Sequence, residues 1–254
     1  MMRVLTYLNK GMTIDRERRK NRVLEAVVKA HIDSALPVSS SYVARNLNLS
    51  SATIRSVMSA LEEEGFIRQP YISAGRIPTD LGYRRYVDNV MFATEVAEND
   101  ILSRVRRFIN RSKFFEDAIE ATSQAISKIT NYTGIAVSPN NRLYFDGTYH
   151  MLEQPEFRES ETARDFLRVI EGRGEFVRVL NRDLETTGTA IRIGRENAFE
   201  ELHECTIITS AYKFKNRVSG NIGVIGPMRM PYEEVVPLVE YLARATTITL
   251  EEFA

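Results

Sequence analysis

Residues 39–64 contain two short amphipathic segments separated by a turn, and this pattern is the strongest constraint on the fold. Ser39 or Ser40 can cap a helix that runs to Leu47. After a turn at residues 48–49, Ser50 or Ser51 can cap a second helix, which spans residues 51–64 and ends before Gly65. A longer helix over residues 14–34 precedes them. Its predicted apolar positions are Val23, Leu24, Val27, Val28 and Ile32, and its predicted basic polar face holds Arg16, Arg18, Arg19, Lys20 and Arg22. The spacing predicts a helix-turn-helix.

The second helix divides into two faces. Its apolar residues Ile54, Val57, Met58 and Leu61 follow the helical period and are expected to face a core. The opposite face is small and polar with one cation, which favours entry into a DNA major groove, where Arg55 could bond to a guanine edge. An ordinary surface helix with Ser and Thr outside would look similar. The predicted base-reading residues are Ser51, Ala52, Thr53, Arg55, Ser56 and Ser59.

A hairpin is predicted directly after this helix. Residues 66–72 are extended in character, residues 73–75 supply turn chemistry, and residues 76–78 return. A hairpin in this position is typical of a winged helix-turn-helix, although Arg76 at its tip could simply be solvated. A further helix, over residues 81–92, is expected to pack through its tyrosines. The residues expected to hold the DNA backbone are Arg18, Arg19, Ser40, Arg68, Tyr71, Ser73, Gly75 and Arg76.

The charge distribution supports an anionic partner for this part of the chain. Net charge is zero over the 254 residues, but residues 1–92 hold 14 Lys and Arg against 9 Asp and Glu. A net positive N-terminal segment, followed by a net negative remainder, favours contact of the N-terminal segment with a polyanion. Residues 1–12 show no helical pattern, so we expect a frayed tail there or translation that begins at Met12.

The rest of the chain is predicted to be α+β. Helices are expected over residues 95–110 and 114–130, as connectors or dimer elements. Strands are then expected at 134–138, 142–145, 190–193, 205–214 and 219–225, with helices at 160–171, 176–186 and 231–250. The hairpin link near residue 215 favours an antiparallel sheet. The predicted domains are residues 1–92, a helical linker or dimer element at 93–131, and residues 132–254.

Several stretches of the N-terminal residues match the pattern of a known family: Pro37-Val38, Leu49-Ser50, Ala52–Arg55, Met58, Leu61–Phe66, Gln69-Pro70, Ser73–Asp80, Gly82–Arg84 and Tyr86–Asp88. They resemble the HrcA family of heat-inducible transcription repressors. Where that family usually shows Asn-Asp, this chain has Ser56-Val57, so its operator sequence is expected to differ.

The C-terminal half also resembles this family, whose fold there is GAF-like. The family places two strands and an inserted dimerisation subdomain where this chain has only residues 139–142, so a shortened member with a reduced sheet is expected. The resemblance implies a homodimer on an inverted-repeat operator of chaperone genes, and the GroEL chaperonin as effector. It rests on Asp146-Gly147, Gln154–Phe157, Ile193-Gly194, Glu196-Asn197, Gly223–Pro227, Arg229-Met230, Tyr232 and Pro237–Val239.

Several kinds of chemistry have no residues to support them. Cys205 is the only cysteine, which excludes an internal disulfide and a multi-cysteine zinc site. His31, His150 and His203 show no ligand spacing, and no phosphate loop or nucleophile elbow occurs. We therefore expect no enzyme activity and no cofactor. No apolar run is long enough for a membrane helix, and a cytoplasmic location is expected.

Three functions remain open at this point. The first is a dimeric repressor that binds double-stranded DNA. The second is a metabolite-responsive regulator that senses a small ligand through residues 132–254. The third is a winged helix used for protein contacts, which would be expected to carry more apolar side chains on its outer face than Thr53, Arg55, Ser56 and Ser59 provide.

Overall fold

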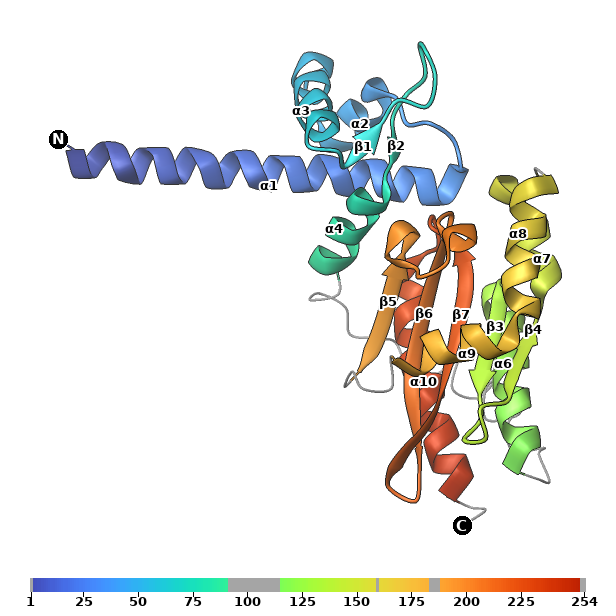
Figure 1. The fold of residues 1–254 in the computed structure, drawn as a ribbon. Coiled ribbons are helices and arrows are strands. Elements are labelled where there is room, and N and C mark those ends of the chain that lie inside the picture. Colours follow the sequence, from blue (N-terminus) through green and yellow to red (C-terminus); the bar gives the residue numbers. More distant parts are fainter. Residues whose placement is uncertain (1, 91–114, 159, 183–187, 252–254) are drawn as a thin grey trace. The chain divides into compact units, whose positions relative to one another are not determined.

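The computed structural model describes residues 2–90, 115–158, 160–182 and 188–251. The chain divides into two compact units, Met1–Ala93 and Thr94–Ala254, each of which has its own core (Figure 1). Helices and an antiparallel sheet occur together, so the predicted α+β class is confirmed. Residues 95–110, for which a helix was predicted, lie outside the described residues.

The N-terminal unit is mainly helical. Its helices are α1 (Met2–Ser34), α2 (Ser40–Leu47), α3 (Ser51–Glu63) and α4 (Asp80–Val90). Ser39 caps α2 and Ser50 caps α3, each through a side-chain oxygen that accepts a backbone N–H. The two helices are joined through Asn48, which adopts a left-handed conformation, and Gly65 with φ of +80° follows α3. The predicted pair of short helices is therefore confirmed.

The first helix begins earlier than predicted. We expected a start at residue 14, but α1 begins at Met2. The segment before residue 14 lacks an apolar stripe, yet it contains no proline, and adding residues to an existing helix costs far less than nucleating one. Val23, Leu24, Val27 and Val28 are fully buried in this unit, as the helical spacing predicted.

The hairpin after α3 has very short strands. β1 (Ile67–Arg68) pairs antiparallel with β2 (Ile77–Pro78). Val38 adds a third extended segment, because it exchanges two backbone hydrogen bonds with Arg76, of 2.8 and 2.9 Å. The predicted extended stretch over residues 66–72 is thus wrong beyond Arg68. Pro70 has no N–H to give to a ladder, and the remaining residues form a loop.

The second unit is built on a five-stranded antiparallel sheet in the order β4-β3-β7-β6-β5. Its strands are β3 (Thr133–Val137), β4 (Leu143–Asp146), β5 (Thr189–Ile193), β6 (Cys205–Phe214) and β7 (Arg217–Pro227). The remaining elements are α6 (Phe115–Thr130), α7 (Thr148–Leu152), α8 (Ser160–Glu171), α9 (Arg173–Arg182), α10 (Tyr232–Glu251) and three short 3₁₀ helices, Pro155–Phe157, Gly194–Glu196 and Glu200–Leu202.

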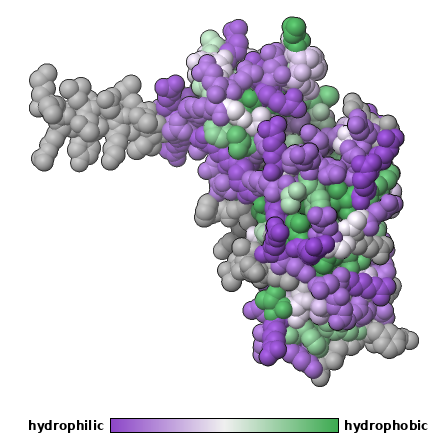
Figure 2. All heavy atoms as spheres, in the orientation of Figure 1, coloured by the Kyte–Doolittle hydropathy of each residue, from purple (hydrophilic) through white to green (hydrophobic). Residues whose placement is uncertain are grey.

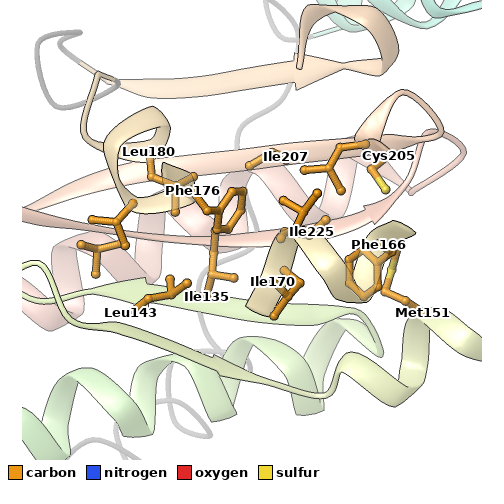
Figure 3. Close-up of a cluster of buried hydrophobic side chains, with 14 of the residues drawn as sticks. Ile135, Leu143, Met151, Phe166, Ile170, Phe176, Leu180, Cys205, Ile207 and Ile225 are labelled. Carbon is orange, nitrogen blue, oxygen red and sulfur yellow. The ribbon is translucent and has the colours of Figure 1, made fainter. Parts of the chain in front are cut away.

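Helices lie on both faces of this sheet, and successive side chains of each strand point to opposite faces. On one face Ile135, Ile207 and Ile225 join Phe166 of α8 and Phe176 of α9 in one apolar cluster (Figure 3). On the other face α6 and α10 pack closely. A Cβ atom at Gly134 would lie 2.0 Å from the carbonyl oxygen of Ser123 in α6, which explains the absence of a side chain there.

A tight turn at residues 138–142 joins β3 and β4, at the position where the sequence predicted a shortened segment. Ser138 N–H donates to the Arg142 carbonyl at 2.9 Å, and Asn141 has φ of +60°. The amide of Asn181 in α9 donates to the Asn141 side chain at 2.8 Å. Because β3 and β4 are direct neighbours, the sheet stays continuous without further strands at this position.

Candidate nucleic-acid interface

The outward face of α3 is the starting point of the candidate site. Five of its predicted base-reading residues, Ser51, Ala52, Arg55, Ser56 and Ser59, are exposed, while Ile54, Met58 and Leu61 are buried on the other side. Thr53 is half-buried. Its hydroxyl lies 2.8 Å from Ser50 Oγ, which also accepts the Thr53 N–H at 3.0 Å. The sixth residue therefore takes part in the helix cap.

Arg55 is the only cation on this face. Its Nε donates to the carbonyl of Ser51 at 3.3 Å, so the side chain lies back along the first turn of α3. The guanidinium stays exposed at the end of the helix whose backbone N–H groups favour anions. The position allows contact with either a phosphate or a base edge.

A groove of about 520 Å³ lies between α1 and α3. Arg19 lines it and donates to Asp15 at 3.0 Å, one turn away on α1. Arg18 is exposed but does not line the groove, so α1 brings only one of the two predicted arginines beside α3. The groove residues are Asp15, Arg16, Arg19, Lys20, Thr53, Ser56, Val57 and Ala60.

Lys20 differs from Arg16, Arg18, Arg19, Arg22 and Lys29 of α1, which are exposed, because it is buried. Its ammonium group forms ion pairs with Glu17, at 2.9 Å, and with Glu64 at the end of α3. The hydrogen bonds to Glu64 and Glu17 raise the pKa of Lys20, and those from Lys20 and Arg85 lower the pKa of Glu17. The expectation that Lys20 belongs to an exposed basic face is therefore wrong. It anchors α1 to α3 instead.

Glu62 is a second anchor that the sequence did not reveal. Its Oε1 accepts the backbone N–H of Gln69 at 3.2 Å, and its Oε2 accepts Arg76 Nε at 2.9 Å. These two partners stand on the two arms of the β1–β2 hairpin, so one carboxylate of α3 holds both arms. The Arg76 guanidinium, predicted to reach DNA, is engaged with Glu62 in this structure.

The other hairpin residues surround a narrow loop. Arg68 and Tyr71 are exposed, and Ser73 adopts φ of +68°. At Gly75 a Cβ atom would lie 2.4 Å from the Val38 carbonyl oxygen, so a glycine is required where the arm meets the segment before α2. Ser40 is half-buried in the first turn of α2.

The described part of the second unit offers less for a ligand. A polar depression of about 220 Å³ lies along β4, lined by Glu120, Ser123, Gln124 and residues 142–146. Drug-sized ligands usually occupy roughly 300–1,000 Å³. Among the described residues no group of His, Cys, Asp and Glu is arranged to hold a metal ion. In the same residues no helix is long and apolar enough to cross a membrane.

Comparisons with known proteins connect this architecture to one family. The model of the HrcA protein C-terminal domain matches residues 138–236. The heat-inducible transcription repressor HrcA of Symbiobacterium thermophilum is 28% identical over 329 aligned positions, which cover 89% of this chain and 96% of the relative. The repressor of the same name from Ruminiclostridium cellulolyticum is 29% identical over 329 positions, covering 88% and 94%. Both alignments are longer than the 254 residues of this chain, so the relatives contain residues that it lacks.

A solved structure shares the fold. The crystal structure of a hypothetical protein, determined at 2.2 Å resolution, superimposes with a TM-score of 0.81 at 19% sequence identity. The match covers 93% of this chain and 99% of the other. The solved structure shows the fold alone, whereas the sequence relatives place the chain in the class of transcription repressors. The family-model match and the named relatives support membership of the HrcA family, whose members named above are heat-inducible repressors.

Proposed function

We propose that this protein represses chaperone genes by binding an inverted-repeat operator as a homodimer, with α2 and α3 as the helix-turn-helix and the β1–β2 hairpin as its wing. The helix α3 enters the major groove, where Ser51, Ala52, Thr53, Arg55, Ser56 and Ser59 read bases. Arg18, Arg19, Ser40, Arg68, Tyr71, Ser73, Gly75 and Arg76 hold the DNA backbone.

The outward face of α3 carries this proposal. It is exposed, it contains no large apolar residue, and its carboxylates are confined to the far end of the helix. Two of the three, Glu62 and Glu64, are engaged by Arg76 and Lys20 of the same unit. A phosphate backbone can therefore approach the first two turns of α3 without meeting an uncompensated acidic cluster.

The remaining assignments follow from the family and from the two compact units. We assign residues 1–92 to DNA binding, residues 93–131 to a linker or dimer element, and residues 132–254 to a GAF-like regulatory domain. A dimer presents two copies of α3, and their separation should equal one helical turn of DNA, about 34–36 Å, or a multiple of it.

Binding to duplexes that carry chaperone promoters tests the proposal. Fluorescence anisotropy at several salt concentrations should detect sequence-preferring binding that weakens as salt rises. Arg55→Ala should weaken it, whereas Arg244→Ala, which removes an exposed arginine from α10 in the other unit, should not. Absence of sequence-preferring binding by the full-length protein at low micromolar concentration would contradict the proposal.

A separate experiment is needed to identify the effector that regulates the repressor. The family resemblance implies the GroEL chaperonin, which would raise the fraction of repressor that refolds into a DNA-binding form. A metabolite-responsive regulator would instead be stabilised by a small ligand, for which the 220 Å³ depression beside β4 is the site to test. Refolding yields with and without chaperonin, set beside a thermal-shift screen of metabolites, distinguish these two effectors.

A further inference from the structure

The tip of the β1–β2 loop exposes two large apolar side chains. Ile72 is 93% exposed and Tyr71 is 65% exposed. Figure 2 shows an isolated hydrophobic group at the top of the view, where this loop ends in Figure 1. Ile72 contributes no apolar burial to the fold, so the folded domain gains nothing from an isoleucine at this position.

The tip is nevertheless held in one conformation by its own hydrogen bonds. Ala74 N–H donates to the Tyr71 carbonyl at 3.0 Å, closing a turn that contains Ile72 and Ser73. The Gln69 side chain donates to the Ala74 carbonyl at 3.1 Å. Below this turn, Glu62 holds both arms of the hairpin. The loop therefore presents Ile72 outward on an ordered support, as a binding element requires.

Charge and shape indicate the kind of partner. Residues 67–79 contain Arg68 and Arg76 and no Asp or Glu, which favours an anionic partner. A narrow tip with two side chains offers far less than the roughly 800 Å² per partner of a typical protein interface. It does suit the minor groove of B-DNA, which is about 6 Å wide and accepts apolar side chains against its sugars and base edges.

We infer that Ile72, flanked by Tyr71, inserts into the minor groove of the operator beside the major groove that α3 occupies. This inference rests on the proposed DNA-binding function. Because the guanine 2-amino group projects from the minor-groove floor, insertion should favour A·T pairs at the position that the tip meets. The tip thereby adds a sequence preference that no residue of α3 supplies.

The test uses the full-length protein and a chaperone-promoter duplex in fluorescence anisotropy. Ile72→Ala should weaken binding about five- to tenfold, as expected if the atoms removed are half-buried in the complex. The salt dependence should stay unchanged because no charge is lost. Arg68→Ala, in contrast, should flatten the slope of log binding constant against log salt by about 0.9. Ile248→Ala is the matched control, since Ile248 is 60% exposed on α10 of the other unit.

Base substitution in the duplex identifies the groove. Replacing the A·T pairs under the wing by I·C changes the major-groove pattern but keeps the minor groove free of the amino group, whereas G·C introduces it. Wild type should bind the I·C duplex more tightly than the G·C duplex, and Ile72→Ala should lose this difference. Equal binding of both duplexes by wild type would overturn the inference.

Two further results separate this inference from the proposed function. Wild-type affinity in Ile72→Ala would overturn the inference while leaving operator binding intact. If wild type binds no duplex with sequence preference, the proposed function fails first and the inference fails with it.

Discussion

Replacing Glu62 by alanine should release both arms of the β1–β2 hairpin from α3. One carboxylate oxygen accepts the Gln69 N–H at 3.2 Å, and the other accepts Arg76 at 2.9 Å from two guanidinium nitrogens. The mutant leaves the arginine with no counter-charge on α3. The hairpin then depends on its two short strands and on the bridge to Val38.

The free energy of unfolding that Glu62→Ala loses can be bounded from the geometry. Hydrogen bonds to charged groups contribute about 1.5–3 kcal/mol when shielded, and exposed ion pairs about 0.2–1 kcal/mol. The side chains of Arg76 and Glu62 are 23% and 34% exposed, between these limits. We therefore expect Glu62→Ala to lower the free energy of unfolding by about 1–2 kcal/mol. For a domain of this size, each kcal/mol lowers Tm by about 4–8 °C.

Affinity for random duplex should rise in Glu62→Ala, although the stability of the protein falls. Removal of a carboxylate near the proposed interface removes its repulsion of phosphate and the ion pair that competes for Arg76, so affinity for random duplex should rise and its salt slope should steepen. Preference for the operator over random duplex should fall because the wing is no longer fixed. Glu62→Gln should be intermediate, since an amide oxygen can still accept the Gln69 N–H.

Thermal unfolding and anisotropy titrations on both duplexes measure these effects. Glu63→Ala is the control, because it removes the same charge from the exposed neighbouring residue. If Glu62→Ala and Glu63→Ala shift Tm and the salt slope equally, the changes come from net charge alone. The argument that Glu62 holds the hairpin would then be refuted.

Three other substitutions test separate parts of the molecule. Arg55→Ala should cost about 1–3 kcal/mol more on the operator than on random duplex; equal losses in the titrations would show that Arg55 contacts phosphate and not a base. Gly75→Ala should lower the Tm of the N-terminal unit, because its Cβ would meet the Val38 carbonyl oxygen at 2.4 Å; an unchanged melting curve would contradict this. Burial, with the hydrogen bond to Glu116, raises the pKa of Tyr144 to about 12, so the neutral phenol stabilises the fold at lower pH and this contribution is lost as pH rises from about 10 to about 12. Tyr144→Phe should lose less stability than wild type across that range in alkaline unfolding.

The helices near the candidate site were predictable because their signals are local. In α3 the apolar positions Ile54, Met58 and Leu61 recur at helical spacing, and a serine stands at the start. The choice between Ser50 and Ser51 as cap needed the backbone, since either hydroxyl could serve. The five strands of the second unit were predicted for the same reason, with ends that differ by no more than two residues.

The contacts that fix the site were not predictable, because they join residues far apart in the chain. Lys20 and Glu64 are separated by 44 positions and Glu62 and Arg76 by 14, whereas helical spacing reports only on neighbours three or four apart. The sequence predicted Arg76 as a DNA-backbone contact and Lys20 as part of a basic face, and it gave no sign that either pairs with a carboxylate of α3. The short helix α7 and the three 3₁₀ helices were missed because so few residues carry no measurable period.

The base and the tip of the loop between β1 and β2 are subject to different evolutionary constraints, the first on stability and the second on binding. At its base Gly75 is fixed by a close backbone approach, and Gln69 and Arg76 are held by Glu62 of α3, so substitutions there reduce stability. At its tip Ile72 is almost fully exposed, and most replacements leave folding unchanged. Selection on this tip can therefore act on binding alone. Two descendants of one repressor gene could diverge in operator preference through a single tip substitution, without passing through an unstable intermediate.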